Sequence, residues 1–307
     1  MDHSPPHDLP PHDRRPPDLH TGKLRHAIYR PATQTVPLVL ASAHSGHDYR
    51  ADFLAAARLS PQALRRSEDS FVDELFNGAL ALGAPMLAAT FPRAYCDPNR
   101  EAWELDPAMF DGPLPGWVNT TSARVSAGLG TIARIVATGE PIYRDKLNFA
   151  DIEDRIQECW MPYHAALADL ITDTKNQFGY CILIDCHSMP SAGPAAAKPD
   201  GTTPAPHVVL GDAFGTSCAV AVVQHMEQAL QAEGYRVRRN EPYAGGYVTR
   251  HYGRPREHVH ALQIELSRDL YMDEARYTRG PGFARVQSDL TRLIASLCAA
   301  LPALITG

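Results

Sequence analysis

Three apolar runs in this sequence contain or lead into side chains that can bind a metal ion or move a proton. His44 follows the run at 36–43, His187 follows the run at 181–186, and Glu265 lies in the run at 260–266. A catalytic zinc ion commonly has two histidine ligands, one carboxylate ligand and an open position for water. A glutamate that is not a ligand can then accept a proton from the attacking water. The pattern therefore indicates a metal site with His44 and His187 as ligands and Glu265 as general base.

The runs that carry these residues are typical of buried strands, because they are short, continuous and apolar. A further strand is predicted at 86–91, and helical spacing of apolar residues is found at 60–82, 148–178, 215–234 and 281–304. Strands that alternate with helices predict an α/β fold, a wound, mixed and largely parallel sheet with helices on both faces. Ligands bind beyond the strand ends of such sheets, which is where the two histidines are expected.

Composition excludes several classes of partner. The chain has 29 Lys and Arg against 35 Asp and Glu, a net charge of −6, and no basic stripe, so we expect no nucleic acid partner. No run approaches about 18 consecutive apolar residues, so we expect no membrane partner. The six cysteines include no CxxC pair, which favours free thiols in a reducing compartment. With no apolar secretory segment at the N-terminus, these features predict a cytoplasmic protein.

The N-terminal region differs from the rest of the chain. Residues 1–22 are rich in proline and histidine and contain little apolar surface, which predicts a disordered arm. We interpret its histidines as part of a solvated tail rather than as metal ligands, because flexible histidines lack neighbours that orient them. Residues 23–307 are predicted to form a single domain.

Seven strings give the chain a resemblance to a known family. They occur in order between residues 36 and 273 and read ASAHSGHDY, SEDSFVDELF, CDPNRE, ILIDCHSMPS, VVLGDAFGTSC, NEPYAGGYVTRHYG and LQIELSRDLYMDE. Together they resemble the N-formylglutamate amidohydrolase family. The resemblance implies a fold like that of the zinc carboxypeptidases, which is described as phosphorylase/hydrolase-like.

The resemblance also implies roles for single residues. His44 and His187 match the histidine ligands, and Glu265 in QIELSRD resembles the general base of the carboxypeptidase motif FELRD. Asn99 and Arg100 resemble the pair that binds the substrate's carboxylate. An arginine suits this role because its planar guanidinium donates two parallel hydrogen bonds to a carboxylate.

Two further residues are candidates for substrate binding. Arg268 follows a motif position, although a structural ion pair is an equally good interpretation of it. Tyr243 belongs to a loop with two glycines, which suits a backbone that turns sharply or approaches a ligand closely.

The carboxylate ligand departs from the carboxypeptidase pattern. Those enzymes have HxxE, whereas this chain has His47 at the final position, followed by Asp48. The helix predicted at 60–82 offers Glu68, Asp69 and Asp73 instead. Asp69 and Asp73 are four residues apart and would share one face of that helix, so we place Asp69 first and Asp73 second. A solvated helix surface, with a capping role near Ser67, is the alternative.

The implied activity is hydrolysis of the amide bond of N-formyl-L-glutamate to formate and L-glutamate, a step of histidine degradation, with one Zn²⁺ per chain. The expected partner is thus a small anionic acyl-amino acid. One alternative is an amidohydrolase for another N-acyl amino acid, a short peptide or a cell-wall amide, since fold does not fix substrate. A second alternative is a non-catalytic relative that binds a dicarboxylate, although such a protein would have no use for Glu265 as a base.

Overall fold

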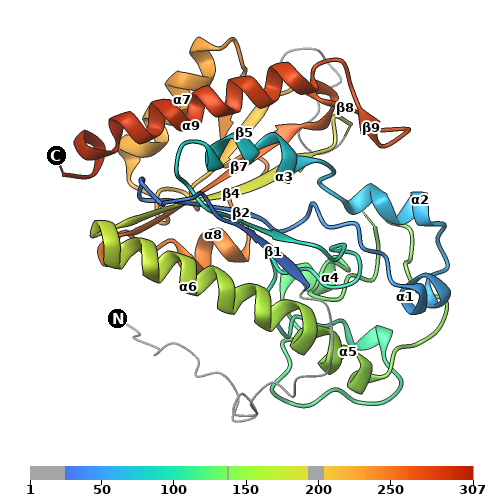
Figure 1. The fold of residues 1–307 in the computed structure, drawn as a ribbon. Helices are drawn as coiled ribbons and strands as arrows, with labels where there is room; N and C mark the ends of the chain where they lie inside the picture. The colour runs from blue at the N-terminus through green and yellow to red at the C-terminus, as the bar shows by residue number, and fades with distance from the viewer. Residues whose placement is uncertain (1–24, 137, 193–203, 307) are drawn as a thin grey trace.

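A seven-stranded mixed sheet forms the centre of the protein (Figure 1). The computed structural model describes residues 25–136, 138–192 and 204–306, so the arm predicted at 1–22 lies outside the described residues. The strand order is β1-β3-β2-β4-β7-β5-β6. Strand β2 is parallel to β3 and β4, β4 to β7, and β5 to β6, whereas β1 and β5 are antiparallel to β3 and β7. The predicted fold class, a largely parallel wound sheet, is therefore confirmed.

The strands have the following bounds: β1 His26–Tyr29, β2 Leu38–Ser42, β3 Met86–Ala89, β4 Cys181–Met189, β5 Val208–Gly211, β6 Val237–Arg239 and β7 Val259–Ser267, with β8 Met272–Asp273 and β9 Thr278–Arg279 in a separate small ribbon. The helices have the following bounds: α1 Ala51–Ala56, α2 Pro61–Leu64, α3 Val72–Leu75, α4 Ala123–Ser126, α5 Phe149–Arg155, α6 Met161–Phe178, α7 Val220–Ala232, α8 Tyr247–Tyr252 and α9 Phe283–Thr306.

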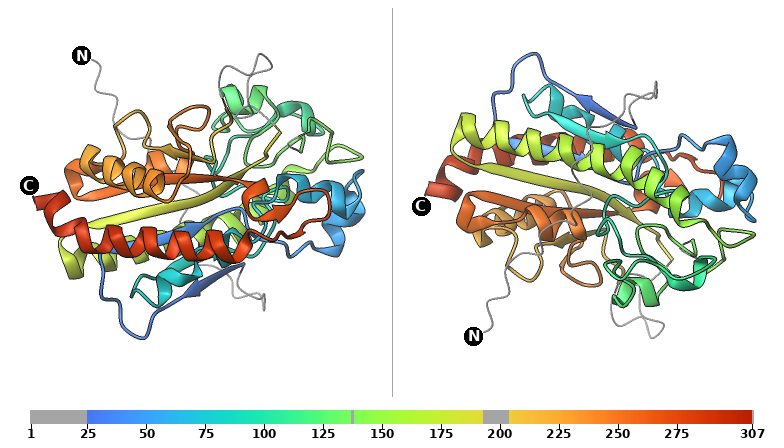
Figure 2. Two further views of the ribbon diagram at one scale, coloured as in Figure 1. Left: turned by 90° about the horizontal axis from the view of Figure 1, so that it is seen from above. Right: turned by 90° about the horizontal axis from the view of Figure 1, so that it is seen from below.

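Helices cover both faces of the sheet. In Figure 1, α6 and α8 lie below the sheet while α3, α7 and α9 lie above it, and Figure 2 shows the same two layers from above and below. Successive side chains of a strand point to opposite faces. In β2, Val39 and Ala41 accordingly belong to the core on the α6 side, and Leu38 and Leu40 to the core on the α9 side. The two buried faces explain why the strand reads as one continuous apolar run.

Helix α9 is long and apolar enough to qualify as a candidate membrane span over residues 283–305, although polar residues interrupt its apolar runs in the sequence. Its buried residues recur at helical spacing and pack on the sheet: Val286, Leu290, Leu293, Ile294, Leu297 and Leu301. The same helix carries Asp289, which accepts a hydrogen bond from Tyr235. One apolar face against a core is the arrangement of an amphipathic packing helix.

The prediction of a continuous helix at 60–82 is wrong. The chain forms α2, leaves helical geometry at Glu68, and resumes as α3 after Phe71, whose φ is 67°. The amide of Asp69 donates instead to the backbone oxygen of His44, at 3.0 Å. This long-range bond replaces a helical one, so the periodicity of the flanking apolar residues could not reveal the break.

The helix predicted at 148–178 is present, with one irregularity. Asn148 caps α5 by accepting a hydrogen bond from the amide of Ala150, and α6 ends at Gly179 in the left-handed conformation. Between them, Ile156–Trp160 forms a turn of π-helix. Such turns are often found near functional sites, and this one carries Trp160, which contacts the loop described below.

Candidate metal centre and substrate cavity

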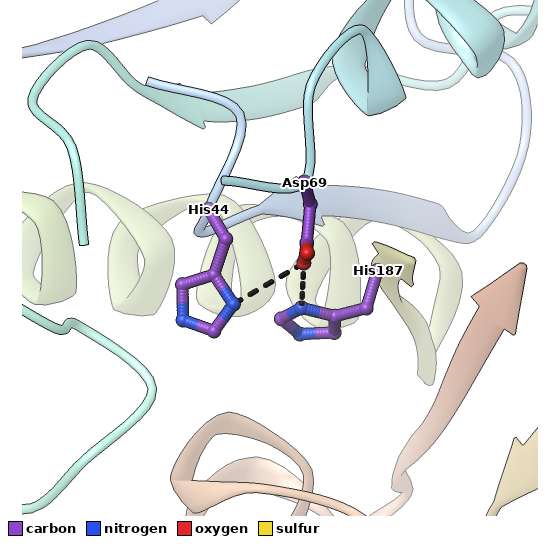
Figure 3. Close-up of side chains that lie close together, drawn as sticks. All are labelled: His44, Asp69 and His187. Atoms are coloured by element: carbon purple, nitrogen blue, oxygen red, sulfur yellow. Dashed lines mark hydrogen bonds and ion pairs between the residues drawn. The ribbon is translucent and has the colours of Figure 1, made fainter. Parts of the chain in front are cut away.

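The candidate metal centre lies at the carboxyl ends of two adjacent parallel strands. His44 follows β2 by two residues, and His187 lies near the end of β4, which pairs with β2. Asp69 joins them from the break between α2 and α3 (Figure 3). All three residues are buried, with exposed fractions of 1% to 2%. The sheet thus positions both histidines, and the bond from the Asp69 amide to His44 positions the carboxylate.

The three side chains present nitrogen and oxygen atoms to a common point. Oδ2 of Asp69 lies 3.3 Å from Nδ1 of His44 and 3.0 Å from Nδ1 of His187, as the dashed lines in Figure 3 indicate. One candidate ligand atom from each residue lies within 4.8 Å of the others, so this buried group could hold a metal ion. Two imidazoles and one carboxylate are the donor set of several catalytic zinc sites.

The far side of each imidazole faces a second carboxylate. Nε2 of His44 lies 2.7 Å from Oδ1 of Asp97, and Nε2 of His187 lies 2.8 Å from Oδ1 of Asp185. A ring that donates its Nε2 proton to a carboxylate keeps the Nδ1 lone pair available for a metal ion. The side chains present therefore fit a metal ion in ligand type and in orientation.

The charges around the centre favour an ionised Asp69. Burial alone would raise the pKa of this carboxyl, but hydrogen bonds from His187 and His44 and the charge of Arg268 hold it well below its ordinary value. Burial would lower the pKa of His187, yet the charge and hydrogen bond of Asp185 hold it well above its ordinary value. The pocket between the two imidazoles thus attracts positive charge.

Glu265 lies beside the metal centre rather than within it. It is directly opposite His187 in the pairing of β4 with β7, and its Oε1 accepts a hydrogen bond of 3.0 Å from Gln263. Burial raises its pKa to about 7, helped by the charge of Asp69 and opposed by that of His187. A carboxylate whose pKa is close to neutrality is suited to general acid–base catalysis.

Helix α6 and the π-helical turn before it hold the loop 96–101 in place through two hydrogen bonds. Nε1 of Trp160 donates to the backbone oxygen of Arg100, and Nε2 of His164 lies 2.8 Å from the backbone oxygen of Pro98. Burial lowers the pKa of His164 to about 3, so this ring is neutral and donates through Nε2. These contacts fix Asp97 and Asn99, which are the neighbours of Pro98 in the chain.

Asn99 and Arg100 line the same cavity as the metal centre. Nδ2 of Asn99 lies 3.1 Å from Nε2 of His187, and its Oδ1 accepts a hydrogen bond from the amide of Val248. Arg100 donates from Nε to the backbone oxygen of Leu129 and from Nη1 to its neighbour's backbone oxygen. Both side chains are therefore held in place before any ligand arrives.

Arg268 and Tyr243 also line the cavity, in different circumstances. Arg268 donates to Oδ1 of Asp69 at 3.0 Å and to Ser188 and a backbone oxygen, so each of its three nitrogens has a partner. The structural ion pair that the sequence left open is thus present. Tyr243 is half-buried and packs on a small apolar cluster with Met189 and Val209.

The other three candidate carboxylates point elsewhere. Glu68 bonds to Tyr49, Arg65 and Ser70. Asp73 lies on α3 and does not share a helical face with Asp69, which is a correction to the sequence prediction. Asp48 is near Arg25, at 3.6 Å.

Sequence reasoning missed three polar residues next to the predicted ones. Asp185 precedes His187 by two positions, and because side chains two apart in a strand share a face, this carboxylate could have been found. Asp97 stands in the CDPNRE string but carried no assigned role. Arg93 donates through Nε and Nη2 to Asp97, and no local signal marks it.

The cavity itself has a volume of about 620 Å³, within the usual range for small-molecule sites. One wall carries His44, Asp69, His187 and Glu265, while the remaining lining includes several arginines and the turn at 242–246. A small anionic ligand could therefore be held with its reacting group at the metal centre.

Comparison with known proteins finds relatives along most of the chain. A sequence model of the family described as N-formylglutamate amidohydrolase matches residues 36–272. N-formylglutamate deformylase of Pseudomonas aeruginosa is 34% identical over 243 residues, which cover 78% of this chain and 83% of the relative. The protein of the same name from Pseudomonas putida is 30% identical over 246 residues, with the same coverage. The crystal structure of N-formylglutamate amidohydrolase from Ralstonia eutropha is 38% identical, with a TM-score of 0.85, and the match covers 92% of this chain and 99% of that one.

Proposed function

The chain belongs to the N-formylglutamate amidohydrolase family, and from this premise we propose that it hydrolyses N-formyl-L-glutamate to formate and L-glutamate with the help of one zinc ion. The observation that carries the proposal is the buried group His44, Asp69 and His187, placed beside Glu265 in a cavity lined by arginines. The relatives' names supply the substrate, and the geometry supplies the means of cleaving it.

The two histidines, His44 and His187, would hold the ion through their Nδ1 atoms, and Asp69 would hold it through a carboxylate oxygen. When bound, zinc would supply a Lewis acid that polarises the formyl carbonyl and acidifies water. Asp97 and Asp185 keep the imidazoles in the tautomer and orientation that binding requires. Arg268 fixes the second oxygen of Asp69, so that only Oδ2 turns toward the histidines.

Glu265 acts as general base. It takes a proton from the water that attacks the formyl carbon, and it gives a proton to the amide nitrogen as the carbon–nitrogen bond breaks. The second proton of the water passes from the nascent formic acid to the amine, so the products are formate and the ammonium form of glutamate. A pKa of about 7 allows both transfers, because the side chain is a competent base and a competent acid near neutral pH.

Arginines of the cavity stabilise the substrate's negative charges. We assign a substrate carboxylate to Asn99 and Arg100, with Tyr243 as a further residue of the lining. Arg93 interacts electrostatically with Asp69 and Glu265, and we assign it the charge that develops on the formyl oxygen. Arg268 donates through Nη2 directly to Oδ1 of Asp69, at 3.0 Å, so we assign it to positioning Asp69 ahead of binding substrate.

The test is formate release from N-formyl-L-glutamate by purified protein, before and after removal of metal by a chelator and after return of Zn²⁺. We expect activity in the metal-loaded protein, its loss with chelation and its recovery with zinc. Full activity in protein shown to be free of metal would contradict the mechanism, and metal-loaded protein that releases no formate would contradict the substrate.

A second candidate function is favoured by the size of the cavity. About 620 Å³ is more than a formylated amino acid fills, so an amide with a larger acyl group or a short peptide would also fit. A panel of N-formyl, N-acetyl and N-succinyl glutamates distinguishes the two candidates by the ratio of their kcat/KM values.

A further inference from the structure

The cavity is cationic although the chain as a whole carries a net charge of −6. Its lining includes six arginines and three carboxylates: Arg66, Arg93, Arg100, Arg124, Arg250 and Arg268, against Asp69, Asp97 and Glu265. A cavity of this kind concentrates the field of its charges and attracts anions. The arginines outnumber the carboxylates by three, which is more positive charge than a single substrate carboxylate would balance.

Five of these arginines are bonded to other parts of the protein, either to acidic side chains or to a backbone oxygen. Arg93 and Arg100 share a single carboxylate, Asp97. Arg124 is different: among the residues that the structure describes, its guanidinium has no hydrogen-bond or ion-pair partner, although the residue is half-buried. A partly buried guanidinium without a partner gains most from an anion supplied by a ligand.

The backbone holds Arg124 next to Arg100. Ser122 caps α4 by accepting a hydrogen bond from the amide of Val125, whose side chain is buried. The amide of Leu129 donates to the backbone oxygen of Arg124, and the oxygen of Leu129 accepts from Nε of Arg100. One residue, Leu129, therefore connects the two arginines on the same wall.

The two guanidinium groups also interact electrostatically. Burial lowers the pKa of Arg100 to about 10, and the like charges of Arg93 and Arg124 contribute while Asp97 opposes the shift. Arg100 stays charged at neutral pH and shares its one ion-pair partner, Asp97, with Arg93, so Arg124 faces a neighbour whose positive charge is only partly balanced. A bound dianion would relieve this repulsion, because it would place negative charge near both groups.

Contacts order these residues outward from the metal centre. His44 contacts Asp97, Asp97 lies 3.8 Å from Nη2 of Arg100, and Arg100 is bonded to Leu129 beside Arg124. In an N-acylated glutamate, the α-carboxylate is next to the scissile amide and the side-chain carboxylate lies further away. The order of the contacts therefore matches Arg100 with the α-carboxylate and Arg124 with the side-chain carboxylate.

We propose that Arg124 binds the side-chain carboxylate of the substrate and thereby makes the enzyme select dicarboxylic acyl-amino acids over those with uncharged side chains. The assignment rests on the proposed function, since it names the substrate class of that same cavity.

The experiment compares N-formyl-L-glutamate with N-formyl-L-glutamine, which has a neutral amide in place of the side-chain carboxylate. Arg124→Gln lowers kcat/KM for the acid by about 10- to 100-fold, the range for a lost hydrogen bond to a charged group, mainly through KM. The same variant changes kcat/KM for the amide little. Arg124→Lys gives an intermediate loss, because it keeps the charge and loses the planar pair of donors.

Arg134→Gln is the matched control. It removes one positive charge ten positions along the chain, and Arg134 pairs with Asp106 outside this cavity. We expect both substrates to react with this variant as with wild type. Equal losses on the two substrates in Arg124→Gln, or no loss on the acid, would overturn the assignment.

Calorimetric titration of metal-loaded proteins with the same two compounds separates this inference from the proposed function. Wild type that binds N-formyl-L-glutamate but releases no formate would refute the activity alone. A preference for the acid that Arg124→Gln abolishes would still support Arg124, whereas equal affinity of wild type for acid and amide would reject it.

Discussion

The wall of the cavity that carries the metal centre and the wall that carries Arg124 satisfy their polar groups to different degrees. Around the centre, His44, Asp69 and His187 each have partners within 3.3 Å, and Asp97 and Asp185 support them from behind. On the other wall, the guanidinium of Arg124 has no hydrogen-bond or ion-pair partner among the described residues.

The difference agrees with the two tasks that we propose for these walls, catalysis and substrate recognition. Catalytic groups must be held in the reactive geometry before substrate binds, so the fold satisfies them internally. Recognition groups gain affinity from partners that only the ligand supplies. We call the wall that carries His44, Asp69, His187 and Glu265 the metal wall, and the wall that carries Arg124 the arginine wall. We expect substitutions on the metal wall to affect turnover or metal content, and substitutions on the arginine wall to affect substrate choice.

The largest effect is expected for Glu265→Gln. The amide has nearly the shape of the carboxylate but cannot accept the proton, so kcat should fall by about 10² to 10⁴. Steady-state kinetics and elemental analysis together check this, with zinc content expected to remain at wild-type level. A variant that lost its zinc would identify Glu265 as a metal ligand and would contradict its role as a separate general base.

Arg100→Lys tests the border between the two walls. The ammonium cannot make the paired contact with a carboxylate, and the loss is expected to cost about 1.5 to 3 kcal/mol in substrate affinity. Arg100 also bonds to the backbone of Leu129, so a structural effect must be separated from a recognition effect.

The dimethyl ester of N-formyl-L-glutamate makes that separation. Wild type should use the ester poorly, and Arg100→Lys should reduce kcat/KM for the ester little further. Similar losses on acid and ester would place Arg100 with the supporting structure of the metal wall.

Asp185→Asn tests whether the carboxylates behind the histidines belong to the metal site. The amide keeps an acceptor for Nε2 of His187 but removes the charge, and metal affinity should fall by about 10- to 100-fold. Competition with a chromogenic chelator measures this. Asp289→Asn, a change at a buried aspartate on α9, is the control and should keep wild-type affinity. Unchanged affinity in Asp185→Asn would mean that orientation by charge is unimportant here.

The smallest effect is a dependence on pH. Burial raises the pKa of Glu265 to about 7, so the ionised base is lost as the pH falls through that value, and kcat/KM should fall toward about tenfold per pH unit below it. A metal ion nearby favours the ionised form and moves this limb to lower pH. A profile from pH 5 to 9 should show the acid limb in wild type and not in Glu265→Gln. An identical limb in both proteins would assign it to another group.

Much of the metal wall was predictable from sequence because strands are local features. The runs that became β2, β4 and β7 are continuous and apolar since both faces of each strand are buried, and the polar residue that ends such a run stands out. The helices α6, α7 and α9 were predicted for the same reason, since their apolar residues repeat with helical period. The short strands β1 and β5 lack such a signal, and so the antiparallel pairing of β5 with β7 was not foreseen.

The sequence by itself determined where His44, His187 and Glu265 stand relative to the buried strands, because each lies in or just after a continuous apolar run. Only the tertiary structure decided which carboxylate joins them, since Asp69 is held by a bond to His44 from 25 positions away rather than by a helix. The same holds for Arg124, which no motif marks. Its meaning comes from what surrounds it, a cavity of arginines in which the others already have partners, and such an environment exists only after distant segments pack together.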